Sequence, residues 1–198
     1  MLTIDLSDRV ALVMGGSRGI GAGIVRTLCK AGARVIFTHT HNPERAAQVN
    51  ALVSGIRQDG GEVQAISSDA CDSASTQKVV QNTIAQHGRL DHLVCVVGQT
   101  LKQPAEDTSD DKWQRFLDIN LSSAFYAVRA ALPHMLKASY GRIILIGSSV
   151  VYDGGGGAIE YVASKAGLVG MAAYLTRNYL RKGILTNVIH PCVIDTDL

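Results

Sequence analysis

Short apolar runs alternate with longer amphipathic stretches along the 198 residues of this chain. The runs are bounded by glycine or polar residues and are typical of buried strands, whereas the stretches repeat apolar positions at helical spacing. Strands are predicted at 10–14, 34–38, 62–67, 90–97, 143–146 and 185–190. Helices are predicted at 19–31, 42–60, 73–87, 109–138 and 158–182.

Strands that alternate with helices of this length build parallel βαβ units. Right-handed crossovers then predict an α/β fold, a doubly wound parallel sheet of the Rossmann type with strand order 3-2-1-4-5-6. At about 150 residues per domain, the length suits a single domain over 1–198. Ligands of such sheets bind at the carboxyl ends of the strands, so the residues after each strand are the candidates for chemistry.

Charge and composition exclude several classes of protein. With 19 Lys and Arg against 17 Asp and Glu, the net charge of +2 gives no general attraction to nucleic acid or to an anionic membrane. No apolar run approaches the ~20 residues of a membrane span, and the first residues do not resemble a secretory signal, so we expect a cytoplasmic protein. The four cysteines are scattered, which predicts reduced, buried thiols, and the absence of an HExxH motif disfavours a metal site.

A glycine-rich turn follows the first predicted strand. Residues 15–21 read GGSRGIG and lead directly into a helix. Glycines allow a tight turn and let backbone amides approach a pyrophosphate, and the helix amino terminus adds the positive end of its dipole. The preceding strand and the following helix are the context that a dinucleotide site requires.

The end of the second strand favours NADP(H) over NAD. An NAD site usually has an acid there to bind the ribose 2′-hydroxyl, but this chain reads FTHTH at 37–41. Arg18, in the glycine turn, can reach the same corner, and an unopposed cation suits a 2′-phosphate. Charge from His39 and His41 at low pH is the alternative interpretation, and solvated loop histidines are the favoured one.

Three polar residues after the fifth strand suit proton transfer. Tyr161 and Lys165 are separated by four positions, so they share one helix face. An ammonium beside a phenol favours the phenolate, and such a tyrosine can protonate a developing alkoxide. Ser148, at the ligand edge of the sheet, can hold a substrate carbonyl in line with the tyrosine, whereas its neighbour Ser149 would point differently.

Together these motifs resemble the short-chain dehydrogenase/reductase family, and most of all its 3-oxoacyl-acyl-carrier-protein reductase branch. The resemblance covers nearly the whole chain. It rests on GGSRGIG at 15–21, Asp69, DINLSS at 118–123, GRIILIGSS at 141–149, YVASKAG at 161–167 and NVIHP at 187–191.

The resemblance implies catalytic residues and a nucleotide site. The catalytic candidates are Asn120, Ser148, Tyr161 and Lys165, with Lys165 also bonding the nicotinamide ribose and Asn120 distorting its helix and holding a water. The cofactor-binding candidates are Gly15, Ser17, Arg18, Gly19, Ile20, Gly21, His39, Asp69, Ala70, Gly98, Tyr161, Lys165, Pro191, Ile194 and Thr196. Asp69 would contact the adenine, and Ile194 and Thr196 the carboxamide and phosphates. A plain helix residue at Asn120 and a turn-forming role for Asp69 stay open.

The chain departs from the family pattern in three places. Cys95-Val96-Val97-Gly98 replaces Asn-Asn-Ala-Gly after the fourth strand, so apolar side chains either pack there or weaken cofactor binding. Cys192 replaces the glycine after Pro191, so its backbone must avoid positive φ. The sequence stops at Leu198, where family members continue with a substrate-covering segment, one more helix and a seventh strand. The chain is either truncated or continues in a tail beyond Leu198, and the intact elements up to Thr196 favour the tail.

We therefore expect an NADPH-dependent reductase of a small carbonyl substrate. The substrate would be a 3-oxoacyl thioester, free or bound to a carrier protein, or a similar ketone. A sugar or polyol dehydrogenase of the same family is one alternative. A nucleotide-binding protein with little catalysis is the other. The helices at 109–138 and 158–182 have broad apolar faces, which on the first include Ala124, Phe125, Val128, Ala131 and Leu132. Core packing explains one apolar stripe of each helix. The family uses the outer sides of these two helices for assembly, so the resemblance implies a homodimer or homotetramer.

Overall fold

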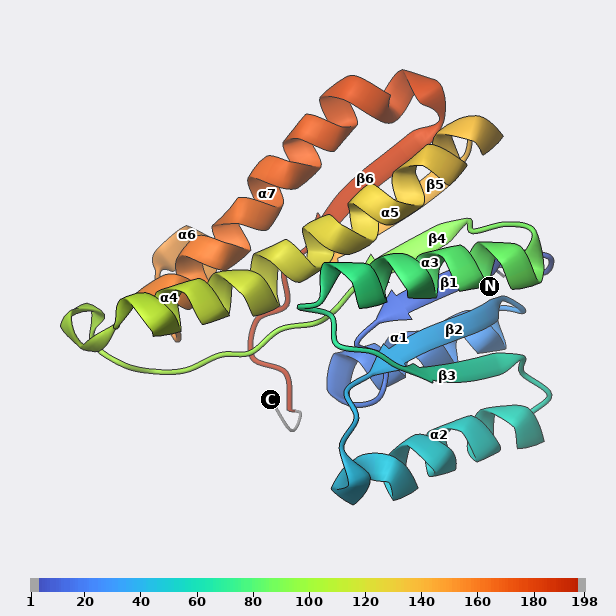
Figure 1. Ribbon diagram of the computed structural model, residues 1–198, viewed down its shortest axis with the longest axis horizontal. Helices are drawn as coiled ribbons and strands as arrows, with labels where there is room; N and C mark the ends of the chain where they lie inside the picture. Colours follow the sequence, from blue (N-terminus) through green and yellow to red (C-terminus); the bar gives the residue numbers. More distant parts are fainter. Residues whose placement is uncertain (1–3, 196–198) are drawn as a thin grey trace.

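A six-stranded parallel sheet organises the molecule (Figure 1). The computed structural model describes residues 4–195. The strand order is β3-β2-β1-β4-β5-β6, which confirms the predicted doubly wound topology. The strands are β1 (Val10–Met14), β2 (Arg34–His39), β3 (Val63–Ser67), β4 (His92–Cys95), β5 (Gly141–Ile146) and β6 (Ile184–Ile189).

Helices connect successive strands. The α-helices are α1 (Gly19–Lys30), α2 (Ala46–Gln58), α3 (Ser73–His87), α4 (Asp110–Leu117), α5 (Ser123–Ala138), α6 (Val150–Asp153) and α7 (Ile159–Tyr179). A π-helical turn, η3 (Asp118–Ser122), joins α4 to α5, and short 3-10 turns lie at η1 (Pro43–Arg45), η2 (Ala105–Asp107) and η4 (Leu180–Lys182). Within the described residues no helix is long and apolar enough to cross a membrane.

Both faces of the sheet are covered, so β1 is buried along its whole length. Alternate residues of a strand point to opposite faces. Leu12 packs with α3, α5 and α7 in one core, whereas Val13 packs with α1 and α2 in the other. The near-continuous apolar strands are therefore those of a parallel sheet covered on two sides.

Local signals fix where the helices begin. The Asn42 side chain accepts a hydrogen bond from the Glu44 amide at 2.9 Å, so the predicted start at Asn42-Pro43 is confirmed, although its first turn is 3-10. Asp72 caps α3 by accepting from the Ala74 and Ser75 amides. Such caps satisfy amides that have no partner within the helix.

Two predicted elements differ from the structure. The strand predicted at 90–97 is shorter, because Val97 packs against Gly15 in the glycine turn beyond the end of β4. The helix predicted at 109–138 is interrupted by η3, where the Ser123 amide donates to the Asp118 carbonyl, a five-residue step. The glycine loop at 153–158 is preceded by the short helix α6, which was not predicted.

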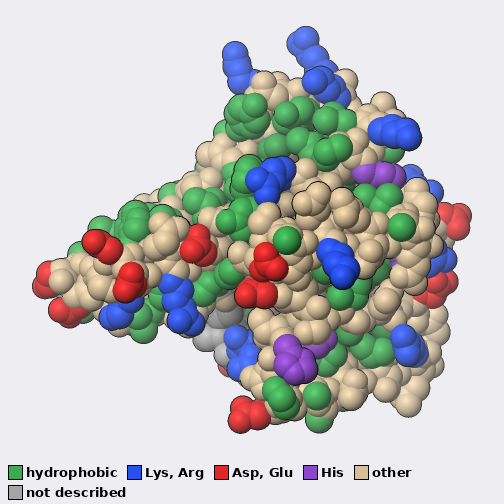
Figure 2. All heavy atoms as spheres, in the orientation of Figure 1, with side chains coloured by type: hydrophobic (Ala, Val, Ile, Leu, Met, Phe, Trp, Pro, Cys, Tyr) green, Lys and Arg blue, Asp and Glu red, His purple; other side chains and the backbone are tan. Residues whose placement is uncertain are grey.

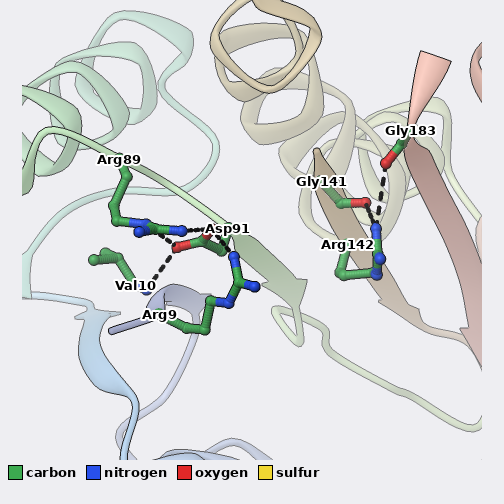
Figure 3. Close-up of polar contacts among 7 residues, drawn as sticks. All are labelled: Arg9, Val10, Arg89, Asp91, Gly141, Arg142 and Gly183. Atoms are coloured by element: carbon green, nitrogen blue, oxygen red, sulfur yellow. Dashed lines mark hydrogen bonds and ion pairs between the residues drawn. The ribbon is translucent and has the colours of Figure 1, made fainter. Parts of the chain in front are cut away.

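A buried carboxylate ties β1 to β4 at their amino ends (Figure 3). Asp91 accepts hydrogen bonds from Arg89, from Arg9 at 3.2 Å and from the Val10 amide at 2.9 Å. Burial raises the pKa of Asp91, but the bonds from Arg89 and Val10 outweigh it, and the net pKa is lowered. This cluster stabilises the end of the sheet at which β1 and β4 begin. Ligands are expected at the other end, beside the carboxyl ends of the strands.

Candidate active site

The glycine turn after β1 fits a backbone-lined phosphate site. Gly15 adopts a φ of +88°, which favours glycine, and a Cβ at Gly21 would lie 2.1 Å from the Gly15 carbonyl oxygen. A Cβ at Gly16 would lie 2.5 Å from the Cβ of Phe37. Thr38 anchors the turn, because its hydroxyl accepts from the Gly15 amide at 3.0 Å and its carbonyl from the Gly16 amide at 3.0 Å.

The amino terminus of α1 opens onto this turn. Arg18 occupies the N-cap position in extended conformation, with no side-chain cap hydrogen bond, and the first helical turn holds no acid. Gly19 has a φ of +49°, while Ser17 and Ile20 are half-buried beside it. Uncapped first-turn amides and the helix dipole suit an anion, so these residues fit the pyrophosphate of a dinucleotide.

The two strands on one side of β1, β2 and β3, end at or just before His39, Asp69 and Ala70. His39 is the last residue of β2, and the centre of its ring lies 6.4 Å from that of Phe37. Its Nδ1 lies 3.0 Å from the Thr40 carbonyl oxygen. Asp69 is exposed, and its side chain accepts a hydrogen bond from the Cys71 amide at 2.9 Å. Asp69 thus has the turn-forming role that the sequence left open beside adenine contact. Ala70 is buried.

The unusual residues after β4 pack into the protein. Val96 and Val97 contact the two cores, and the Val97 side chain lies against Gly15. A Cβ at Gly98 would lie 3.0 Å from Asn120 Oδ1 and 3.2 Å from Lys165 Nζ. The glycine at this position therefore brings a polar group of η3 and one of α7 together at the end of β4.

Lys165 is buried beside Tyr161. Its Nζ donates to the Ile146 carbonyl at 2.9 Å and lies 5.8 Å from the centre of the Tyr161 ring. Burial lowers the pKa of Lys165 to about 8, partly offset by Cys95. The same burial raises the pKa of the Cys95 thiol to about 12, against the effect of Lys165. The two predicted partners on α7 thus share one face, with the ammonium removed from bulk water.

Ser148 is held at the end of β5. Its hydroxyl oxygen accepts from the Val150 amide at 3.4 Å, and its carbonyl lies 2.9 Å from His190 Nδ1. Val150 packs in one apolar cluster with Phe116 and Tyr161, so the serine segment and the tyrosine lie side by side. Ser149, by contrast, donates its amide to the Pro191 carbonyl at 2.9 Å and is less buried than Ser148.

Asn120 sits in the π-helical turn and is 1% exposed. Its Oδ1 accepts from the Gln99 amide at 2.9 Å, and its Nδ2 donates to the carbonyls of Gln99 and Phe116, both at 3.1 Å. The helix is distorted at Asn120, as the resemblance implied. The two contacts with Gln99 reach outside the helix, and Gln99 is a partner that sequence reasoning missed.

The segment after β6 carries the remaining candidates. Pro191 is half-buried and Ile194 is 51% exposed, whereas Thr196 lies outside the described residues. Cys192 has no positive φ, as predicted. Its predicted burial is wrong, because Cys192 is exposed and Cys71 is only half-buried, while Cys29 and Cys95 are buried. All four cysteines are free thiols.

Comparison with known proteins decides the family. The model of the short chain dehydrogenase family matches residues 9–198. The chain belongs to the short-chain dehydrogenase/reductase family. The 3-oxoacyl-(acyl-carrier-protein) reductase FabG of Escherichia coli is 37% identical over 195 residues, covering 98% of this chain and 77% of that protein. FabG of Chlamydia pneumoniae is 33% identical, covering 100% and 78%.

Solved structures agree with the fold. A dehydrogenase/reductase from Sinorhizobium meliloti has a TM-score of 0.91 at 36% identity, over 98% of this chain and 76% of that one. A short-chain dehydrogenase/reductase from Serratia marcescens has a TM-score of 0.89 at 35% identity, over 99% and 78%. The predicted resemblance to this family of oxidoreductases, and to its 3-oxoacyl reductases, is confirmed.

Proposed function

We propose that this chain reduces a small ketone with NADPH, and that a 3-oxoacyl thioester is its substrate class. The observation that carries the proposal is the meeting of Tyr161, Lys165 and Asn120 with the Ser148 segment beside the glycine turn, at one end of the sheet. The names of the FabG relatives support the substrate class. We also propose that residues 1–198 form a single nucleotide-binding domain.

Each residue has a role in the proposed reaction. NADPH supplies the hydride when it is bound. The Ser148 hydroxyl holds the substrate carbonyl oxygen, and the Tyr161 hydroxyl gives that oxygen a proton as negative charge develops on it. The Lys165 ammonium favours the phenolate that is left, and its remaining hydrogen bonds suit a ribose. Asn120 fixes η3 and Gln99 beside these groups.

Phosphate binding falls to the other predicted residues. The turn at Gly15 and Gly21 and the amides that begin α1 suit the pyrophosphate. The end of β2 carries no acid, and Arg18 stands at the helix cap, which supports NADPH over NADH. Asp69, Ala70, Pro191 and Ile194 remain proposed nucleotide contacts.

The proposal extends to assembly. Phe125 on α5 is 45% exposed, and Tyr174 on α7 is 63% exposed. Large apolar side chains left in solvent on these two helices support the predicted homo-oligomer. A monomeric mass in analytical ultracentrifugation would contradict it. The cytoplasmic location is likewise a proposal.

The test is NADPH oxidation by the purified protein with 3-oxoacyl thioesters, free or carrier-bound, and with sugar ketones as a second panel. We expect turnover with the thioesters and preference for NADPH over NADH. Tight NADPH binding in calorimetry without turnover on either panel would favour the nucleotide-binding alternative. Turnover confined to the sugars would favour the polyol dehydrogenase alternative.

A further inference from the structure

A buried carboxyl group lies one residue before Tyr161. Glu160 is 0% exposed. Acidic side chains are almost never buried without partners, and Glu160 has several. Its Oε1 accepts from Gln103 Nε2 at 3.1 Å, and its Oε2 accepts from the Thr108 hydroxyl at 3.0 Å. Gln103 Nε2 also donates to Thr108 Oγ1 at 2.8 Å, and Lys112 Nζ donates to Gln103 Oε1 at 2.9 Å.

These bonds fasten one segment to the first turn of α7. We call residues 99–108, which lead from β4 towards α4, the roof segment. Its start is held by Asn120 through Gln99, and its Leu101 carbonyl accepts from the Ala158 amide at 2.8 Å. Glu160 holds the other end. Several acidic side chains lie on the surface of the projecting end of the molecule, around α4 (Figure 1 and Figure 2), whereas the Glu160 carboxyl is buried.

The roof segment borders a hollow next to the candidate active site. Lys102, Gln103 and Pro104 line it from one side, and Gly156 and Gly157 from the other. Gly157 also lies against the Tyr161 ring, because a Cβ there would approach Cδ1 of Tyr161 to 2.6 Å. The roof segment therefore lies across this hollow from the glycine that contacts the tyrosine ring.

We propose that Glu160 is a positioning residue that holds the roof segment against α7 and thereby shapes the substrate pocket beside Tyr161. The inference rests on the proposed function for the identity of the pocket. The glycine turn at 15–21 makes none of these bonds. Losing Glu160 should therefore impair the use of the carbonyl substrate far more than the binding of NADPH.

The kinetic test compares Glu160→Ala and Glu160→Gln with Glu106→Ala, which removes an exposed carboxyl from the same segment. Glu160→Ala should lower kcat/KM for the ketone by about 10- to 100-fold, since small displacements of a pocket are costly. Glu160→Gln keeps an acceptor for Gln103, and the Thr108 hydroxyl can rotate, so activity should recover to within about fivefold of the parent. The Kd for NADPH should change less than about twofold in every variant.

A second readout does not depend on turnover. In hydrogen exchange of the unliganded protein, Glu160→Ala should speed exchange at the Ala158, Asp107 and Thr108 amides by about tenfold or more, while β1 amides keep their rates. Thr108→Val, which removes only one bond to the carboxyl, should give a smaller effect at the same amides. Hydrogen exchange can be measured even if the parent protein reduces none of the ketones. Failure of the proposed function can therefore be distinguished from failure of the role proposed for Glu160.

Three results would overturn the inference. The first is equal acceleration of exchange in the roof segment and in β1, which means that Glu160 contributes only to global stability. The second is an unchanged kcat/KM for the ketone in Glu160→Ala, and the third is a loss of NADPH affinity as large as the loss in kcat/KM. A local change in exchange together with a selective loss of ketone turnover supports it.

Discussion

The ammonium nitrogen of Lys165 donates a hydrogen bond of 2.9 Å to the carbonyl oxygen of Ile146. This contact ties helix α7 to the last residue of β5, two positions before Ser148. It places a buried cation between the end of β5 and the ring of Tyr161, whose centre is 5.8 Å from the Lys165 nitrogen. Several measurable consequences follow from that placement.

The first prediction concerns pH. Burial lowers the pKa of Lys165 to about 8, so the free protein loses this positive charge as the pH rises through that value. Because the ammonium favours the phenolate, kcat/KM for ketone reduction should be level below about pH 8 and fall roughly tenfold per pH unit above it. In Lys165→Arg the side chain stays charged, so kcat/KM should no longer fall above about pH 8. The same fall in both proteins would contradict its assignment to Lys165.

The same group also affects stability. The folded pKa of Lys165 is below its unfolded value, so between these values the unfolded chain binds more protons. The Lys165 contribution to the free energy of unfolding should therefore rise with pH from about 8 to about 10.4 and be constant outside that window. Urea titrations of the parent and of Lys165→Met across this range check the sign.

The second prediction separates the two adjacent serines. Ser148→Ala removes the hydroxyl proposed to hold the carbonyl oxygen, and kcat should fall by about 100-fold or more. Ser149→Ala leaves the backbone bond to Pro191 intact and should change kcat by less than about threefold. Steady-state kinetics on both variants are sufficient. Equal losses would mean that the wrong serine, or neither, faces the substrate.

The third prediction concerns cofactor choice. If Arg18 binds the 2′-phosphate, Arg18→Ala should raise KM for NADPH by about tenfold or more and leave KM for NADH nearly unchanged. Arg26→Ala is a suitable control, because Arg26 is an exposed arginine of the same helix, away from its amino terminus. An equal effect of Arg18→Ala on both nucleotides would remove Arg18 from the phosphate site.

The fourth prediction concerns the opposite end of the sheet. Asp91→Ala leaves Arg9, Arg89 and the Val10 amide without their buried partner and should lower the free energy of unfolding by about 2 kcal/mol. The exposed pair of Glu62 and Arg34 is the control, and Glu62→Ala should cost less than about 1 kcal/mol. Denaturant midpoints measure both. Similar costs for the two variants would contradict the bracing role of Asp91.

The pH dependence of that bracing has a defined sign. The pKa of Asp91 is lowered in the folded protein, so its contribution to stability is complete above the unfolded value of about 3.9 and is lost as the pH falls below it. Asp91→Asn should flatten the acid limb of stability measured between neutral pH and about pH 3.

Much of the fold could be predicted because its signals are local. Apolar runs such as 10–14 are buried along their whole length, and Asn42 and the glycine turn mark the boundaries that the structure has. The π-helical turn at Asp118–Ser122 was not visible as an element, because one extra residue per turn barely alters the apolar pattern of a long helix. Only the resemblance pointed to a distortion at Asn120.

The candidate site was predictable where its partners are close in sequence. Tyr161 and Lys165 lie four residues apart on one helix, so spacing alone places them together. Glu160 binds Gln103 and Thr108, which are 57 and 52 residues away, and no local pattern relates them. The contact of His190 with the Ser148 carbonyl, 42 residues away, was missed for the same reason.

The most direct test of the central claim is single-turnover oxidation of NADPH by the protein with a 3-oxoacyl thioester, compared with Tyr161→Phe. The phenylalanine ring keeps the apolar contacts with Phe116 and Val150 but has no proton to give. We expect hydride transfer in the parent and a loss of about 100- to 10,000-fold in the variant, with NADPH affinity retained. Equal rates in the two proteins, or no oxidation by the parent with saturating nucleotide, would contradict it.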